Sequence, residues 1–307
     1  MEDEATRTRR ATAGYALALL ATVVWSGNFL VVRGLSDALS PVSLAFWRWV
    51  VAIAVLAPFS WRGLREDWPA LRAHGRYLAL TSLLGVSVFN TAIYVAGRTV
   101  AAVDLSIIAA SSPVFVILLT RVFHREPLGS GRLAGVALSL GGVIWLVTDG
   151  QPEHLLHLAL GSGDLVMLGA ALSFAGYTLL VRQRPAGVRL QSFALSSFVL
   201  GLVFLTPIYL WSAWDLPARI PDTPVLLAIL YVGVFASVVA YLAWNAAIAR
   251  IGPSRAAVVY YAIPVFSGLG GWLLLDEPIS AADAVSAILI VAGIVMANRQ
   301  GREMRRC

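Results

Sequence analysis

The sequence predicts an all-α integral membrane protein of ten transmembrane helices, arranged as two inverted five-helix repeats. Three observations predict this fold: an apolar composition, a one-sided distribution of arginine, and an internal repeat. Of the 307 residues, 59% are hydrophobic and only 13% are charged, with a mean hydropathy of +0.78. A soluble domain is about 45–50% apolar and about 25% charged, and it could not cover so much apolar surface. The composition therefore excludes a soluble enzyme, a nucleic-acid-binding module and a disordered chain.

Apolar runs recur along the chain at lengths suited to helices that cross a bilayer. A helix needs roughly 20 apolar residues to span the hydrocarbon core, whereas transmembrane β-strands are shorter and alternating. Ten runs are of the helical kind: Tyr15–Leu35, Pro41–Ser60, Tyr77–Ala96, Val100–Phe123, Leu133–Thr148, Leu165–Val181, Phe193–Trp211, Val225–Ala247, Ala256–Leu275 and Ala284–Ala297. The acidic start of the chain and the long first run favour a retained helix over a cleaved signal peptide.

Arginine marks one side of the predicted bundle. Cytoplasmic loops of membrane proteins collect Lys and Arg, and all 23 basic residues here are Arg. With the N-terminus inside, the outer segments hold only Arg33, Arg98 and Arg219, Arg48 lies within a span, and the other 19 fall on the inner side. An error of one span would destroy this alternation. We therefore expect ten spans with both termini cytoplasmic, the tails being residues 1–12 and 299–307.

The chain repeats itself at a nearly constant offset. Matching residues lie 151 positions apart late in each half and 149 apart early in it: Pro113–Phe115 with Pro264–Phe266, Glu126-Pro127 with Glu277-Pro278, and Gly27 with Gly176. The predicted repeats are residues 13–148 and 163–298. Each holds an odd number of spans, so the two must lie in the membrane with opposite orientation. Inverted repeats place a substrate site near the midplane and permit alternating access; a duplicated scaffold without transport is the alternative.

Short motifs give the chain a resemblance to a known family. They are Trp25–Asn28, Phe46–Arg48 and Ala110–Pro113, with a Glu-Pro pair after the fourth span of each half. On these residues the chain resembles the EamA family of ten-helix carriers, in the drug/metabolite transporter superfamily, over about residues 13–298. The resemblance implies export of amino acids and other small metabolites, or carriage of sugars, nucleotide sugars and phosphorylated intermediates.

Two departures from that superfamily bear on ion coupling and on cargo. Its small four-helix drug pumps carry a first-helix Glu that binds protons and cations, but the first span here has no acidic residue. Plastid-type phosphate exchangers hold anions with basic residues in late helices, and no Lys or Arg occurs between Ala256 and Asn298. The first departure means that the ion coupling of the drug pumps cannot be transferred, and the second makes phosphorylated cargo unexpected. A cavity rich in phenol and indole side chains with few charges favours a secondary exporter of amino acids or related amphiphilic compounds. Carriage of other neutral metabolites or drugs (sugars, nucleosides) and a non-transporting sensor or scaffold are the alternatives.

Asparagine and tyrosine side chains are the main candidates for binding cargo. Asn90 and Tyr94 share one helix face, as do Tyr241 and Asn245, and the offset of 151 maps each pair onto the other in swapped order. A buried amide is costly unless it is hydrogen-bonded or faces a wet cavity. We expect two walls of one cavity, with hydrogen bonding between helices as the structural alternative. The full expected lining is Trp25, Asn28, Asn90, Tyr94, Ser111, Tyr177, Tyr241, Trp244, Asn245 and Tyr260.

Two prolines are expected to interrupt helices within the membrane. Pro113 and Pro264 lie inside predicted spans, and each removes one backbone donor, so that the carbonyls of Ala109 and Tyr260 lose their usual partner. Ser111 could satisfy the first of them. We expect a helix break that faces substrate, or a hinge; a static kink is the alternative.

Arg48 and Asp104 are the only charged residues well inside predicted spans. An ion pair between them would lower the cost of burying both charges. The alternative is that they form a gate, or that Arg48 anchors a carboxylate of the cargo.

No cofactor or metal is expected. The one cysteine is Cys307, and the His-containing segment Glu153–His157 lacks the HExxH pattern of zinc proteases. An enzyme is therefore not expected. The expected partners are a small-molecule substrate and the lipid bilayer, without nucleic acid, and small residues such as Gly135 and Gly142 leave a homodimer open. The abundance of Ala and Arg without Lys indicates a bacterial genome, hence a multi-pass protein of the plasma membrane.

Overall fold

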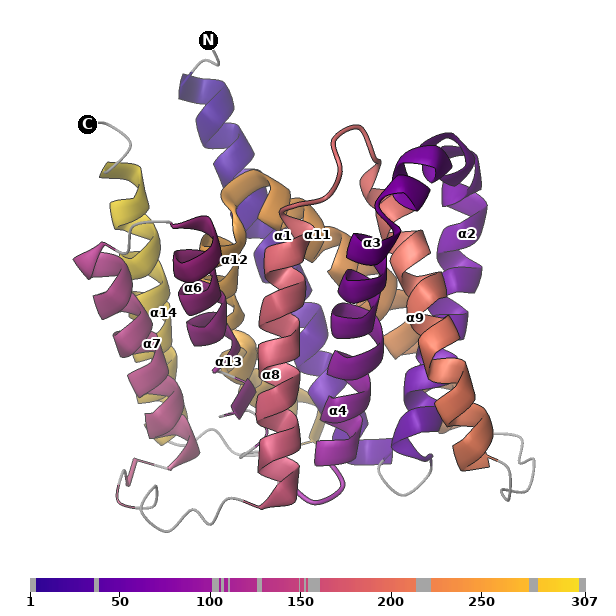
Figure 1. The fold of residues 1–307 in the computed structure, drawn as a ribbon. Coiled ribbons are helices and arrows are strands. Elements are labelled where there is room, and N and C mark those ends of the chain that lie inside the picture. Colours follow the sequence, from indigo (N-terminus) through magenta and orange to yellow (C-terminus); the bar gives the residue numbers. More distant parts are fainter. Residues whose placement is uncertain are drawn as a thin grey trace.

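The structure is a computed structural model, and it describes residues 4–35, 39–100, 105, 108–109, 111–125, 129–148, 150–151, 153, 161–213, 222–275 and 281–303. All regular structure in these residues is helical, as predicted (Figure 1). Asp104 and the two Glu-Pro pairs, Glu126-Pro127 and Glu277-Pro278, lie outside the described residues.

The helices follow one another along the chain with short connections. The first half forms α1 (Glu4–Leu35), α2 (Pro41–Ala73), α3 (Gly75–Ser82), the π-helix η1 (Leu83–Val88), α4 (Phe89–Ala96), α6 (Ser112–His124) and α7 (Ser130–Val147). The second half forms α8 (Ser162–Val181), α9 (Leu190–Ala213), α10 (Thr223–Tyr231), the π-helix η3 (Val232–Val239), α11 (Ala240–Ile251), α12 (Pro253–Tyr260), α13 (Ile263–Leu275) and α14 (Ala281–Glu303).

Several of these helical stretches have the length and apolar character of membrane spans. Among the described residues, five stretches meet both conditions of length and apolar character: Pro41–Ala73, Gly75–Ala96, Ser162–Val181, Leu190–Ser212 and Thr223–Ile251. Three more are apolar but shorter: Ser112–His124, Ser130–Trp145 and Ala284–Ala297. Two of the long stretches are continuous helices whose middle is a π-helix, η1 in one and η3 in the other. Together with the composition, these helices identify a multi-pass integral membrane protein.

Helix α2 is longer than the predicted span. Its start is fixed by Ser40, whose Oγ accepts the backbone N–H of Ser43 at 3.1 Å, and by Pro41 at the first helical position. The sequence predicts an end at Ser60, but the helix continues to Ala73. Its 33 residues extend about 50 Å, against about 30 Å for the hydrocarbon core. The charged end of α2, residues 62–73, therefore lies beyond the apolar span.

This charged end is joined to the start of α9. The backbone N–H of Arg189 donates to Oδ2 of Asp67 at 2.9 Å, and the Arg189 guanidinium pairs with Glu66. Asp67 is buried. Burial alone would raise the pKa of Asp67, but the hydrogen bond from the Arg189 backbone, with the charges of Arg189 and Arg184, outweighs it and lowers that pKa.

Replacing Asp67 with asparagine is expected to destabilise the protein at neutral pH only. Because the folded-state pKa lies below the unfolded value of about 3.9, the ionised carboxylate stabilises the fold above that pH, and the contribution is lost as the pH falls through the folded-state value. Thermal unfolding in detergent should show a deficit of roughly 1 kcal/mol at pH 7. The exposed Glu66 should contribute less, so Glu66→Gln is the control. A deficit for Asp67→Asn that persisted unchanged at pH 3 would contradict this account.

Helices from the two halves of the chain interleave. α1 packs against α11 and α13, α8 packs against α4 and α6, α2 packs against α9, and α7 packs against α14. Figure 1 shows α7 and α14 together at one side of the bundle, with α2 and α9 at the other. The main buried cluster draws on both halves, from Trp25 on α1 to Tyr260 on α12. Neither half, therefore, buries its apolar faces alone.

Small residues let α7 and α14 approach each other closely. A Cβ on Gly135 would lie 2.4 Å from the backbone nitrogen of Ala297 and 2.6 Å from the carbonyl oxygen of Gly293. The hydroxyl of Ser139 donates to the Ile290 carbonyl at 3.3 Å. The sequence predicts that small residues of the fifth and tenth spans hold the two halves together, and α7 and α14 make this contact within one chain.

Candidate functional site

The two π-helices lie at equivalent positions of the sequence repeat and present backbone carbonyls to facing side chains. Val88 and Val239, which end them, are 151 positions apart, as are Gly85 and Ala236 inside them. A π-helix shifts the backbone hydrogen-bond pattern and occurs often at functional sites. Each of the two equivalent carbonyls accepts hydrogen bonds from two side chains.

The acceptors are matched but the donors differ. The Gly85 carbonyl accepts the Tyr241 hydroxyl at 2.6 Å and Nδ2 of Asn90 at 3.2 Å. The Ala236 carbonyl accepts Nε1 of Trp25 at 2.9 Å and Nη2 of Arg48 at 3.2 Å. In each case at least one donor comes from the other half of the chain. The two carbonyls therefore join the halves at the centre of the bundle.

The predicted amide and phenol side chains all lie in this region, but they pair differently from the helix-face pairs seen in the sequence. Nδ2 of Asn90 donates to the Tyr241 hydroxyl at 2.8 Å, so these two counterparts bond to each other across the halves. The Tyr94 hydroxyl donates to Oδ1 of Asn28 at 3.3 Å. All four residues are buried.

A third amide–phenol bond repeats the second one in the other half. The Tyr177 hydroxyl donates to Oδ1 of Asn245 at 2.8 Å. Nδ2 of Asn245 is buried and has no hydrogen-bond partner in the part of the chain that the structure describes. A buried amide without a partner loses its hydration without replacement. Asn245 therefore offers a donor that a cargo molecule could satisfy.

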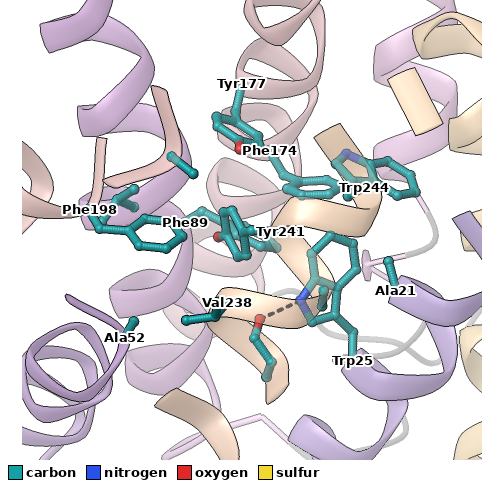
Figure 2. Packing of buried hydrophobic residues seen from close by; sticks show 14 of the residues in the cluster. Ala21, Trp25, Ala52, Phe89, Phe174, Tyr177, Phe198, Val238, Tyr241 and Trp244 are labelled. Carbon is teal, nitrogen blue, oxygen red and sulfur yellow. Dashed lines mark hydrogen bonds between the residues drawn. The ribbon is translucent and has the colours of Figure 1, made fainter. Parts of the chain in front are cut away.

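Aromatic rings surround these hydrogen bonds. The ring centroid of Trp25 lies 5.5 Å from Phe174, 5.6 Å from Tyr241, 5.3 Å from Trp244 and 6.1 Å from Tyr260. Figure 2 shows Trp25, Phe174, Tyr241 and Trp244 gathered from helices of both halves, with the hydrogen bond from Trp25 to the backbone drawn as a dashed line. The edge-to-face arrangements are those that aromatic quadrupoles favour. The structure thus places the predicted Tyr241, Trp244 and Tyr260, together with Phe174, against Trp25.

Arg48 is the charged group of the site, and it is 1% exposed. Its Nε donates to the Ser237 hydroxyl at 2.8 Å and its Nη1 to the Tyr94 hydroxyl at 2.7 Å, besides the bond to Ala236. The guanidinium carbon lies 5.1 Å from the centre of the Trp49 ring. All of these partners are neutral.

The predicted helix-breaking prolines both lie in the first turn of a helix rather than in its middle. Pro113 is the second residue of α6 and Pro264 the second residue of α13. First-turn N–H groups have no partner within a helix, so proline fits there. The Ser111 hydroxyl donates to the Ile108 carbonyl at 2.6 Å, one residue before the carbonyl expected. Ser111 therefore bonds locally, and Tyr260, which ends α12, belongs to the aromatic group.

Three residues of the site, Trp49, Phe198 and Ser237, are missing from the sequence prediction. Nε1 of Trp49 donates to the Val86 carbonyl at 3.2 Å, and its ring lies 4.7 Å from that of Phe198. Phe198 follows Trp49 by 149 positions, so the repeat offset could have found this pair. Ser237 offered no such signal, since serines within helices usually bond only to their own backbone.

The side chains of the site are of a kind that suits an organic molecule better than a metal ion. Among the described residues, no group of three or more His, Cys, Asp or Glu side chains lies together. Neutral hydrogen-bonding groups, aromatic faces and a single guanidinium suit an amphiphilic organic molecule.

Known proteins resemble this chain over almost its full length. A transporter of unassigned substrate from Archaeoglobus fulgidus is 29% identical over 92% of this chain and 96% of its own. A probable terminal-alkyne amino-acid exporter from Streptantibioticus cattleyicolor is 27% identical over 94% of each chain. A probable amino-acid metabolite efflux pump from Escherichia coli is 26% identical over 91% of this chain and 92% of its own.

The fold has also been seen before. One solved structure superposes with a TM-score of 0.77 at 19% identity, covering 95% of this chain and 99% of the other. The model of the EamA-like transporter family matches residues 12–148 and 161–299. The names of the family and of these relatives indicate a transporter rather than an enzyme. The chain belongs to the EamA-like transporter family.

Proposed function

We propose that the protein is a secondary transporter that exports small organic metabolites. The proposed substrate class is amino acids and related amphiphilic compounds. Residues 13–148 and 163–298 form two inverted repeats of five transmembrane helices each. Both termini lie in the cytoplasm, and the membrane is the plasma membrane of a bacterium. Cargo enters between the repeats, at the site built around η1 and η3, and crosses by alternating access.

The observation that carries this proposal is an exchange of contacts between the halves. α1 packs on α11 as α8 packs on α4, and α1 packs on α13 as α8 packs on α6. The same exchange reaches single hydrogen bonds, because Asn28 with Tyr94 corresponds to Tyr177 with Asn245, with amide and phenol swapped. A two-fold axis in the membrane plane would produce this pattern.

Residues that contact their own counterpart support such an axis. Asn90 bonds to Tyr241 and Ser139 to Ile290, each at an offset of 151. Under two-fold symmetry, a residue touches its own counterpart only when it lies near the axis. The axis would therefore pass through the candidate site and between α7 and α14, and the site would lie where the two repeats move against each other.

The chemistry of the site favours amphiphilic cargo. The aromatic rings offer apolar contact, and the amides, phenols and π-helix carbonyls offer hydrogen bonds. In this structure those groups bond to one another, so opening must exchange bonds such as Asn90 to Tyr241 for bonds to cargo. Pro113 and Pro264 begin new helices beside the site and supply points at which the chain can bend. Two relatives named for amino-acid export agree with this class.

Counterflow in proteoliposomes tests the proposal. Vesicles loaded with unlabelled aromatic, branched or small polar amino acids, or with neutral sugars, are assayed for uptake of the labelled compound, with and without a pH gradient. We expect saturable exchange of an amino acid, falling more than about tenfold in Asn90→Ala and Asn245→Ala, because one or two hydrogen bonds to cargo are lost. Thr206→Ala is the control, since the Thr206 hydroxyl donates to the Leu202 carbonyl of its own helix and contacts no residue of the site through a hydrogen bond in the described part of the chain.

Three other results are informative. Exchange of a sugar but of no amino acid would change the substrate class from amino acids to sugars. No exchange of any tested solute would mean that the protein is not a carrier of these solutes. If exchange survives in both Asn variants while their thermal stability falls, the two amides hold helices together and do not bind cargo.

A further inference from the structure

We propose that Arg48 binds a carboxylate of the cargo, so that the cargo is an amphiphile with a carboxylate beside an apolar or aromatic side chain. This inference rests on the proposed transport function and narrows its substrate class. A guanidinium carries five N–H donors. Three are used, one each on Ser237, Tyr94 and the Ala236 carbonyl. The other two have no acceptor among the described residues.

The charge of Arg48 also lacks compensation in the described part of the chain. Its hydrogen-bond partners are two hydroxyls and one carbonyl, and the rings of Trp49 and Tyr94, whose centres lie 5.1 Å and 5.9 Å from the guanidinium carbon, add only weak attraction. Burying a cation among neutral groups is costly. A carboxylate removes that cost and takes two parallel N–H bonds, the geometry in which arginine recognises it most strongly.

The surrounding hydroxyls can also serve an anion. A hydroxyl both donates and accepts. The Ser237 and Tyr94 hydroxyls accept from Arg48 and now donate to the Val232 carbonyl and to Oδ1 of Asn28, and they can exchange those two bonds for bonds to a carboxylate at the guanidinium. They come from different halves of the chain, Tyr94 from α4 and Ser237 from η3. A carboxylate at Arg48 would therefore bond to both halves at once.

The apolar part of such a cargo has a place next to the charge. Nη2 of Arg48 and Nε1 of Trp25 both lie within 3.2 Å of one atom, the carbonyl oxygen of Ala236. Trp25 in turn contacts Phe174, Tyr241 and Trp244. The cation and the aromatic group are thus adjacent, as the two ends of an amino acid with an apolar side chain require.

Matched pairs of probes test the assignment. L-Phenylalanine is compared with L-phenylalaninamide, and L-leucine with L-leucinamide, since each amide lacks the carboxylate but keeps the side chain. Binding to the purified full chain in detergent is read from the ligand-induced rise in unfolding temperature, and competition is read from counterflow in proteoliposomes. The variants are Arg48→Gln and Arg48→Lys, with Arg189→Gln as the matched arginine control outside the site.

We expect the wild-type and Arg189→Gln proteins to bind each acid on the order of 10- to 100-fold more tightly than its amide. In Arg48→Gln that ratio should fall to near one. In Arg48→Lys it should fall only partly, because lysine keeps the positive charge but lacks the paired N–H donors of the guanidinium. If Arg48 were needed only for stability, Arg48→Gln would lose acid and amide binding together. Arg48→Lys would then regain stability and keep the wild-type ratio of acid to amide binding.

Several results would overturn the inference. Equal binding of acid and amide by the wild type, or an unchanged ratio in Arg48→Gln, would show that Arg48 does not read the carboxylate, while counterflow would still support a carrier. If Arg48→Gln loses the preference for the acid but the double variant Arg48→Gln with Asp104→Asn regains it, Arg48 acts by pairing with Asp104 and not by binding cargo. If carboxylate binding depends on Arg48 but no probe shows counterflow, the inference stands and the carrier function fails.

Discussion

Replacing Gly135 with leucine should abolish the folded protein. A Cβ at this position would lie 2.4 Å from the backbone nitrogen of Ala297 and 2.7 Å from its Cα, so the obstacle is backbone that cannot turn aside. A leucine would force α7 and α14 apart along a contact that includes Gly135 with Ala297 and Gly142 with Leu289. Overpacking by single methylene groups in a tight contact already costs about 1–3 kcal/mol, and the whole free energy of unfolding of an ordinary protein is only about 5–15 kcal/mol.

Gly141→Leu is the matched control, because it places the same side chain on the same helix where nothing lies within 4 Å of the added Cβ. The yield of monodisperse protein in detergent and the unfolding temperature distinguish the two variants. We expect almost no monodisperse Gly135→Leu and near wild-type Gly141→Leu. Similar yields would mean that α7 and α14 do not hold the chain together, and that their small residues serve another contact, such as one between two copies.

The class of fold could be predicted from the sequence because the bilayer imposes a simple rule on it. A helix that crosses lipid must be apolar over about 20 residues, so α1, α2 and α9 appear in the sequence as long apolar runs. The helix ends could not be predicted in the same way. Beyond Ser60, α2 continues through charged residues in water, where helix formation depends on contacts such as that of Asp67 with Arg189, from a distant part of the chain.

The π-helices were beyond prediction for a related reason. Leu83–Val88 and Val232–Val239 are apolar sequences with no feature that distinguishes a π-helix from an α-helix. Their backbone carbonyls are satisfied by side chains from other helices, such as Tyr241 on Gly85 and Arg48 on Ala236. The stabilising partners are thus remote in sequence, and only the three-dimensional arrangement brings them together.

The sequence indicates which residues lie together in the candidate site, but not which of them bond to each other. The repeat offset relates Asn90, Tyr94, Tyr241 and Asn245 to one another because duplication preserves position, and the structure places all four in one region. It could not say that Asn90 bonds to its own counterpart while Tyr94 bonds to Asn28. That choice depends on where the axis between the halves would lie, which is a property of helix packing rather than of spacing along one helix.

Replacing Gly85 with alanine should impair transport strongly while leaving most of the fold intact. The added Cβ would lie 2.1 Å from Cδ2 of Tyr177 and within 2.6 Å of two further atoms of that ring. Tyr177 is 1% exposed and packs near Phe174 and Tyr241, so its ring can move only by leaving its place. Its hydroxyl then loses Asn245.

We expect counterflow by Gly85→Ala to fall more than about tenfold, the effect of losing one buried hydrogen bond and its alignment, with a loss of stability of about 1–3 kcal/mol. Gly169→Ala, on α8 where nothing lies within 4 Å of the added Cβ, should match the wild type. Gly85→Ala combined with Tyr177→Val separates the two effects. The smaller side chain makes room for the Cβ and should restore stability, but it cannot bond to Asn245. If stability and counterflow both return, Tyr177 acts only through packing and is not part of the cargo site. If stability returns without counterflow, the phenol acts on cargo or on the bond that must open to admit it.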